Sequence, residues 1–94
     1  MYCMLTKEIV VTNKLGVHAR PAGMIVDITG KSQSDISLEY EGNKVNAKSI
    51  LNVMMLAITP GSTVRFTANG ADEEQVLNQL EQLFRENFHE EQND

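Results

Sequence analysis

The fold of this chain can be read outward from residues 16–22, GVHARPA, where a histidine and an arginine come just before a proline. Proline is tolerated in the first turn of an α-helix because its missing N–H would have no intrahelical partner there. We therefore predict a helix that begins at Ala19, immediately after His18, and ends near Gly30. The residues that recur at the spacing of one helix face are Ala22, Ile25, Val26 and Thr29.

The start of a helix is a natural anion site, because its first backbone N–H groups lack intrahelical acceptors and the macrodipole is positive there. His18 adds an imidazole whose charge changes near neutral pH, and Arg20 adds a fixed cation. A phosphoryl group on His18 would meet the N–H groups of Ala19 and Arg20, while Pro21 would help to fix the first turn. The alternative is an exposed loop histidine without a role. The only other histidine is His89 in the polar tail, and no cysteine or carboxylate spacing completes a metal site, so neither a metal nor a cofactor is expected.

Ninety-four residues with 41% hydrophobic content predict one small domain that spans residues 1–94. The net charge of −5 at pH 7 argues against a nucleic-acid binder, which usually shows a basic face. No apolar run approaches the roughly 20 residues that span a bilayer, so membrane insertion is not expected. Residues 1–14 lack the pattern of a signal peptide, and the single cysteine, Cys3, cannot form an internal disulfide. We therefore expect a cytoplasmic protein, and a monomer by default.

Four segments have the β-branched composition or the alternating pattern of strands. Ile36, Leu38 and Tyr40 alternate with polar residues, and the turn signal at residues 41–43 leads into a return strand. The four predicted strands cover residues 7–12, 36–40, 44–46 and 63–68.

The last predicted helix contains the clearest apolar stripe in the chain, which runs from Val76 to Phe88. Asp72 and Gln75 resemble a capping box at its start, and residues 89–94 are expected to form a frayed polar tail. With a helix after Ser49, the element order becomes β-α-β-β-α-β-α. This order predicts an α+β domain in which a four-stranded antiparallel sheet carries three helices on one face.

Ser49 precedes an apolar run, residues 50–58, and is suited to the N-cap of the middle helix. A phosphate on Ser49 would be held by that helix start and would bring close to two negative charges to the surface. The alternative is a simple cap on a fully buried short helix. A short helix cannot bury every large side chain that follows, so we expect an exposed apolar patch of the kind that often marks a partner surface. The residues that cannot all face inward at a 3.6-residue period are Ile50, Leu51, Met54 and Met55.

Four motifs together resemble the histidine-containing phosphocarrier protein (HPr) family of the bacterial phosphoenolpyruvate-dependent phosphotransferase system. They are GVHARPA at residues 16–22, SLEY at 37–40, NAKSI at 46–50 and ANGADE at 68–73. The resemblance spans about residues 7–88 and implies the open-faced β-sandwich of that family. It also implies that His18 accepts phosphate from enzyme I on Nδ1 and passes it to an EIIA-type acceptor, assisted by Arg20.

The same resemblance implies that an HPr kinase/phosphorylase modifies Ser49, and that the chain is a phosphoryl-transfer intermediate and not a classical turnover enzyme. The motifs NKLG at residues 13–16 and VMML at 53–56 also resemble the nitrogen-related branch, which passes phosphate to regulatory proteins instead of sugar permeases. An alternative of another class is a regulatory binding module that acts through Ser49 and the apolar helix without phosphate relay or sugar transport. The partner-binding residues that the resemblance implies are Ala19, Pro21, Ile50, Leu51 and Met54.

Overall fold

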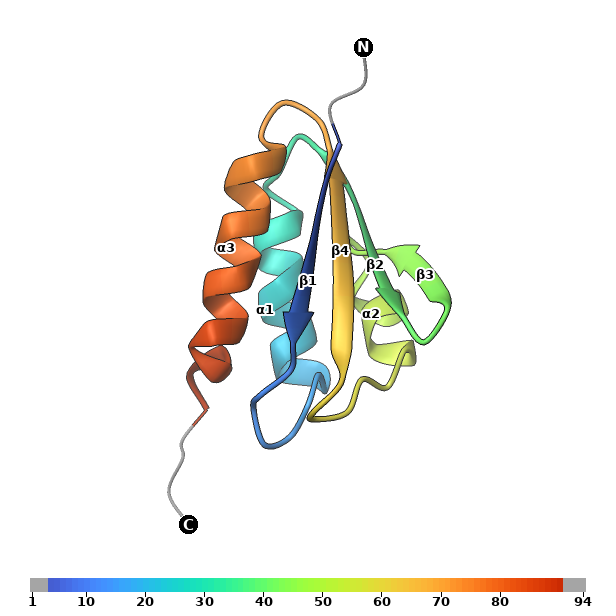
Figure 1. Ribbon diagram of the computed structural model, residues 1–94, viewed down its shortest axis with the longest axis vertical. Helices are drawn as coiled ribbons and strands as arrows, with labels where there is room; N and C mark the ends of the chain where they lie inside the picture. The colour runs from blue at the N-terminus through green and yellow to red at the C-terminus, as the bar shows by residue number, and fades with distance from the viewer. Residues whose placement is uncertain (1–3, 91–94) are drawn as a thin grey trace.

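One antiparallel sheet with three helices on one of its faces forms the protein (Figure 1). The computed structural model describes residues 4–90, so Cys3 and the end of the predicted polar tail lie outside the described part. The strand order is β1-β4-β2-β3, and the predicted element order and architecture are confirmed. The strands are β1 (Leu5–Val10), β2 (Asp35–Tyr40), β3 (Asn43–Asn46) and β4 (Thr63–Asn69). The helices are α1 (Ala19–Thr29), α2 (Ile50–Met55) and α3 (Glu73–Arg85), followed by the short 3-10 turn η1 (Asn87–His89).

The observed bounds of β1 and the end of α2 differ from the predicted ones, each for a structural reason. β1 begins and ends two residues earlier than predicted, because its pairing with β4 runs from Leu5 opposite Ala68 to Val10 opposite Thr63. α2 ends before the apolar run does, because Ala57 adopts a left-handed conformation with φ of 53°. Among the described residues, none of the helices has the length and apolar character needed to span a membrane.

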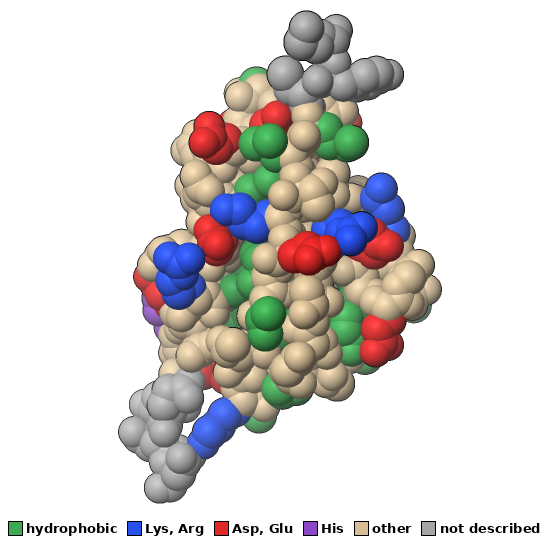
Figure 2. Space-filling view, in the orientation of Figure 1, with side chains coloured by type: hydrophobic (Ala, Val, Ile, Leu, Met, Phe, Trp, Pro, Cys, Tyr) green, Lys and Arg blue, Asp and Glu red, His purple; other side chains and the backbone are tan. Residues whose placement is uncertain are grey.

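Alternation along the strands separates a buried face of the sheet from an open one. The side chains that face the helices on the two central strands are buried, as predicted. On the open face, Arg65 lies 2.9 Å from a carboxylate oxygen of Glu8 and 3.6 Å from one of Glu39. Figure 2 shows acidic and basic side chains across the middle of this face. The buried positions are Ile36, Leu38, Tyr40, Val64, Phe66 and Ala68.

The helices bury the faces that their periodicity predicts, with one departure in each of α1 and α3. In α1, Val26 is half-buried, while the other three predicted positions are buried. In α3, the stripe from Val76 to Phe84 is buried, but the helix ends at Arg85. Phe88 is therefore buried from η1 and not from a continuing helix.

The predicted capping box at the start of α3 is wrong. Asp72 occupies the N-cap position but makes no side-chain cap hydrogen bond. Its carboxylate instead accepts hydrogen bonds from Ser32 Oγ (2.7 Å), Ser34 Oγ (2.6 Å) and the backbone N–H of Gln33 (3.2 Å). The loop between α1 and β2 lies against the start of α3. The hydroxyl groups of Ser32 and Ser34 in this loop donate to the Asp72 carboxylate, which therefore does not cap the helix. Asp72 thus links two segments that are distant in sequence.

Acid should weaken this link. Hydrogen bonds from Ser34 and Ser32 hold the pKa of Asp72 at about 2, below its usual 3.8. Because the folded-state pKa is lowered, the stabilisation is present above the unfolded-state pKa and is lost as the pH falls from about 4 to about 2. We expect the free energy of unfolding, measured by urea titration, to fall more steeply across this range in the wild type than in Asp72→Asn. The exposed Asp27→Asn is the control, and equal slopes for all three proteins would contradict the prediction.

Candidate functional site

His18 occupies the N-cap position of α1, where the sequence predicted it. Its backbone is extended (φ −95°, ψ −160°), and its carbonyl accepts the first helical hydrogen bond from the N–H of Ala22 at 2.9 Å. The imidazole makes no cap hydrogen bond, and 41% of the side chain is exposed. Since Pro21 has no N–H, the first-turn donors available to an anion are those of Ala19 and Arg20.

A tight loop fixes the backbone that enters α1. Gly16 has φ of +70°, and the N–H of Val17 donates to the carbonyl of Ile58 at 3.0 Å. Asn13 is 1% exposed and donates from Nδ2 to the carbonyl of Gly16 at 2.7 Å. The structure buries the amide of Asn13 directly beside the site, a placement that the sequence around residues 13–16 does not indicate.

Glu90 is the functional-site neighbour that sequence reasoning missed. Its side chain is 7% exposed, and its Oε2 accepts a hydrogen bond from Asn13 Nδ2 at 2.8 Å. The same oxygen lies 3.5 Å from Nε2 of His18. The prediction of a frayed tail from residue 89 onward is therefore wrong for Glu90. No local pattern indicates this position, because a left-handed turn after α3 produces it.

That turn and the residue after it are residues 87–90, named here the C-terminal hook. The first three hook residues all have left-handed φ values between 53° and 57°. Phe88 is fully buried, and its ring packs edge-on against Phe84 with centroids 4.6 Å apart. Thr12 Oγ1 donates to Asn87 Oδ1 at 2.6 Å. Aromatic packing and hydrogen bonding thus hold the hook against the loop that precedes His18.

Arg20 lies at the helix start, as predicted, and is exposed, but its guanidinium already makes hydrogen bonds. Nη2 donates to the carbonyl of Phe88 at 2.7 Å, and Nη1 donates to Met24 Sδ at 3.2 Å. A hollow of about 440 Å³ lies alongside. The cation therefore sits between the hook and an open surface. The residues that line this hollow are Lys14, Leu15, Arg20, His89 and Glu90.

Ser49 is the N-cap residue of α2, as predicted, and its Oγ accepts a hydrogen bond from the N–H of Asn52 at 3.3 Å. The expected exposed apolar patch is confirmed, and we call it the α2 patch. It lies beside α1, because a Cβ added to Gly23 would come within 3.6 Å of Ile50 Cδ1. Val53 is the buried residue of α2. The patch consists of Ile50, Leu51, Met54 and Met55, each between 40% and 73% exposed.

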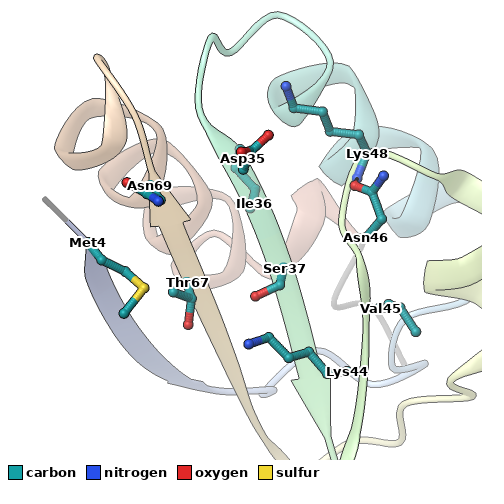
Figure 3. A pocket seen from close by; sticks show the side chains of 10 residues that line it. All are labelled: Met4, Asp35, Ile36, Ser37, Lys44, Val45, Asn46, Lys48, Thr67 and Asn69. Carbon is teal, nitrogen blue, oxygen red and sulfur yellow. Dashed lines mark hydrogen bonds between the residues drawn. The ribbon is translucent and has the colours of Figure 1, made fainter. Parts of the chain in front are cut away.

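A separate hollow of about 360 Å³ lies on the open face of the sheet. Figure 3 shows Ser37, Lys44 and Thr67 lying close together there, on neighbouring strands. Lys48 also lines this hollow, but its Nζ donates to the carbonyl of Ser32 at 3.0 Å. Among the described residues that line it, none is a histidine or a cysteine, so we place the candidate site at the start of α1.

Comparison with known proteins identifies the family to which the chain belongs. The family model described as "PTS HPr component phosphorylation site" matches residues 5–86. The phosphocarrier protein HPr of Xylella fastidiosa (strain 9a5c) is 44% identical over 87 residues, which cover 93% of this chain and 98% of that protein. The HPr of Treponema pallidum (strain Nichols) is 42% identical over 88 residues, which cover 94% and 100%. The crystal structure of HPr-C-His from Thermoanaerobacter tengcongensis matches with a TM-score of 0.88 and 40% identity, over 93% of this chain and 98% of that one.

The fold and these matches define the class as a small phosphocarrier domain. The chain belongs to the HPr family of the phosphotransferase system.

Proposed function

We propose that the protein carries a phosphoryl group on Nδ1 of His18, which it accepts from phospho-enzyme I and passes to an EIIA-type acceptor. The observation that carries the proposal is the exposed imidazole at the N-cap of α1, with no cap hydrogen bond of its own. Nε2 faces Glu90, whereas within residues 4–90 no hydrogen-bond partner reaches Nδ1. Nδ1 is therefore the nitrogen available for transfer.

The helix start supplies the stabilisation that such a transfer needs. The Nδ1 lone pair attacks phosphorus, and negative charge on the phosphoryl oxygens meets the N–H groups of Ala19 and Arg20. The guanidinium of Arg20 donates hydrogen bonds to the same oxygens once it has released the carbonyl of Phe88. The protein is then an intermediate in transfer, without turnover on a small molecule.

The surface around His18 suits docking to partner proteins. We propose that the α2 patch, next to α1, supplies apolar contact area and that Ser49 at its edge is a regulatory phosphorylation site. Exposed methionines adapt to more than one partner surface. In this proposal the protein acts as a cytoplasmic monomer, and HPr kinase/phosphorylase is the enzyme for Ser49. The proposed partner-binding residues are Ala19, Pro21, Ile50, Leu51 and Met54.

Incubation of the protein with phosphoenolpyruvate and enzyme I tests the proposal. We expect one acid-labile phosphate per chain, which mass spectrometry at alkaline pH maps to the peptide that contains His18. Omission of enzyme I should abolish it. Acid-stable phosphate, or the same uptake without enzyme I, would contradict the transfer role and favour a binding module that acts through Ser49. Addition of EIIA proteins of the sugar type and of the nitrogen type then identifies the acceptor by the loss of phosphate from this chain.

Replacement of Arg20 with alanine should slow phosphate uptake at least about tenfold, since a charge-assisted hydrogen bond to the phosphoryl group is lost. The side chain is exposed but holds the carbonyl of Phe88, so the free energy of unfolding should fall by only about 1 kcal/mol. Rapid-quench kinetics and urea titration measure the two effects. Lys31→Ala, which removes an exposed cation at the far end of α1, should change neither. Phosphate uptake at the wild-type rate in Arg20→Ala would contradict the proposal that Arg20 binds the phosphoryl group during transfer.

Replacement of Ser49 with aspartate should weaken enzyme I binding several-fold at low ionic strength and much less at high ionic strength, since salt screens surface charge. Aspartate is as good an N-cap as serine, so α2 should persist. Calorimetric titration at about 50 mM and about 500 mM salt measures the difference. Ser49→Asn, a neutral cap of similar size, is the matched control. Equal weakening by both variants, or weakening that salt does not change, would indicate a local structural effect instead of charge.

A further inference from the structure

We propose that Glu90 is a positioning residue for His18: its carboxylate holds the ring proton on Nε2 and so leaves the lone pair of Nδ1 as the nucleophile. The inference rests on the proposed function of His18 and deepens it. It concerns a residue outside residues 5–86, the part of the chain that the family model matches.

The first support is the geometry between the two side chains. Glu90 Oε2 lies 3.5 Å from His18 Nε2, and 7% of the Glu90 side chain is exposed against 41% of His18. This separation is longer than a formed N–H···O hydrogen bond, which is about 2.7–3.2 Å. Contacts of this kind are commonly long in unliganded proteins and shorten in the reacting complex. A carboxylate at Nε2 fixes which ring nitrogen carries the proton.

The second support is that the carboxylate is held in place from behind. Asn13 Nδ2 donates to Glu90 Oε2 at 2.8 Å and to the carbonyl of Gly16 at 2.7 Å. Asn13 is 1% exposed, and within the described part of the chain its Oδ1 has no hydrogen-bond partner. The reverse orientation of the amide would set its oxygen against two acceptor oxygens. The amide is thus oriented by Gly16 and Glu90, at the expense of an unsatisfied buried oxygen.

The third support is the backbone that carries Glu90 to this place. Three consecutive non-glycine residues, 87–89, adopt left-handed conformations, which are unfavourable for side chains with a Cβ. Such backbone persists only where surrounding contacts determine it, and it is concentrated at functional sites. Here Arg20 holds the carbonyl of Phe88 at 2.7 Å, and Thr12 holds Asn87. The hook therefore carries the carboxylate of Glu90 on a backbone that the guanidinium of Arg20 also holds.

The chemistry that follows conserves every proton. The Nδ1 lone pair of neutral His18 forms a bond to phosphorus, and the bond between phosphorus and the donor breaks with its electron pair on the donor. The proton stays on Nε2, so the product is an N-phosphoryl imidazolium whose positive charge Glu90 balances. In the next step an acceptor attacks phosphorus, the Nδ1–P bond breaks, and its electron pair restores the neutral ring. A protonated ring is the better leaving group, so Glu90 assists onward transfer as well.

The chain contains an internal control of the same chemistry. Glu86 Oε1 lies 3.1 Å from Nε2 of His89, but both side chains are largely exposed and neither residue lies at the start of an α-helix. The Glu86→Gln variant therefore removes a carboxylate from a histidine without altering the proposed pair. Glu90→Ala removes the acceptor at His18, and Glu90→Gln keeps an acceptor oxygen without the charge.

The first experiment is NMR of unphosphorylated protein with ¹⁵N-labelled histidine, at a pH where the rings are neutral. We expect the ring ¹⁵N shifts of His18 to show that Nε2 carries the proton in the wild type and in Glu86→Gln. In Glu90→Ala the shifts should move toward a mixture of the two tautomers, and in Glu90→Gln they should stay close to those of the wild type. Amide spectra check that each variant retains the fold. A His18 tautomer signal that is the same in Glu90→Ala and in the wild type would overturn the proposal.

The second experiment measures phosphate uptake from phosphoenolpyruvate and enzyme I, and onward transfer, by rapid quench. Glu90→Ala should slow both steps about tenfold, with an unchanged KM for enzyme I, and Glu90→Gln should fall between it and the wild type. Wild-type rates in Glu90→Ala would overturn the positioning role even if the ring ¹⁵N shifts of His18 changed. If the wild type takes up no phosphate, the proposed function fails, whereas the NMR result still decides whether Glu90 holds Nε2.

Discussion

The His18→Ala variant is expected to take up no phosphate from phosphoenolpyruvate and enzyme I, while its fold is retained. The imidazole is exposed and makes no cap hydrogen bond, so its removal leaves the packing of α1 intact. The Nδ1 lone pair that would form the bond to phosphorus is gone, and the helix start alone offers only reversible anion binding. Radiolabel incorporation and circular dichroism on the same samples measure both effects.

The second histidine provides the control for this experiment. His89 is also exposed and also lies beside a carboxylate, so His89→Ala tests whether any surface histidine on this chain accepts phosphate. His89→Ala should incorporate label to the wild-type level. Incorporation of label into His18→Ala, or loss of label in His89→Ala alone, would show that the phosphate acceptor does not lie at the start of α1.

The Gly16→Ala variant should lose about 2–3 kcal/mol of stability, because a Cβ at this position meets two obstacles. Gly16 has φ of +70°, and an added Cβ would lie 2.5 Å from the carbonyl oxygen of Ile58 and 3.1 Å from Pro60 Cδ. That carbonyl accepts the N–H of Val17 at 3.0 Å, so relief of the clash displaces the residue that precedes His18. We therefore expect slower phosphate uptake together with a lower free energy of unfolding.

The Gly42→Ala variant separates the effect of the steric clash from the effect of the backbone strain. Gly42 also has a left-handed φ, of +83°, but an added Cβ would meet no atom within 4 Å. Gly42→Ala should lose only the stability that corresponds to backbone strain, about 1 kcal/mol, and its phosphate uptake should be unchanged. Urea titration of both variants provides the comparison. Equal destabilisation would mean that the contact with Ile58 relaxes without effect on the loop.

The elements that were predicted correctly are those whose signals are local. Alternation in β2 and β4 reflects one buried face, and the stripe of α3 reflects a helix on that face, so both can be read from neighbouring residues. His18 could be placed at the start of α1 for the same reason, since Pro21 and the apolar spacing after it identify the first turn.

The features that were missed depend on contacts between distant residues. Asp72 has the sequence signature of a cap, but Ser32 and Ser34 compete for its carboxylate only after the sheet has brought the loop to α3. Glu90 follows a left-handed turn of ordinary residues, for which the sequence carries no signal. Phe88 belongs to the apolar stripe in sequence, but its burial required the helix to end first.

The contact between Asn13 and Glu90 joins residues 77 positions apart. This hydrogen bond forms only when the loop before α1 and the hook after α3 are both folded. Local unfolding of the end of α3 would therefore break it before the sheet unfolds. The reactivity of His18 would then report on the folding equilibrium of the C-terminal end. Conditions that loosen that end, such as mild heat or low urea, should alter the chemistry of the histidine well before global unfolding.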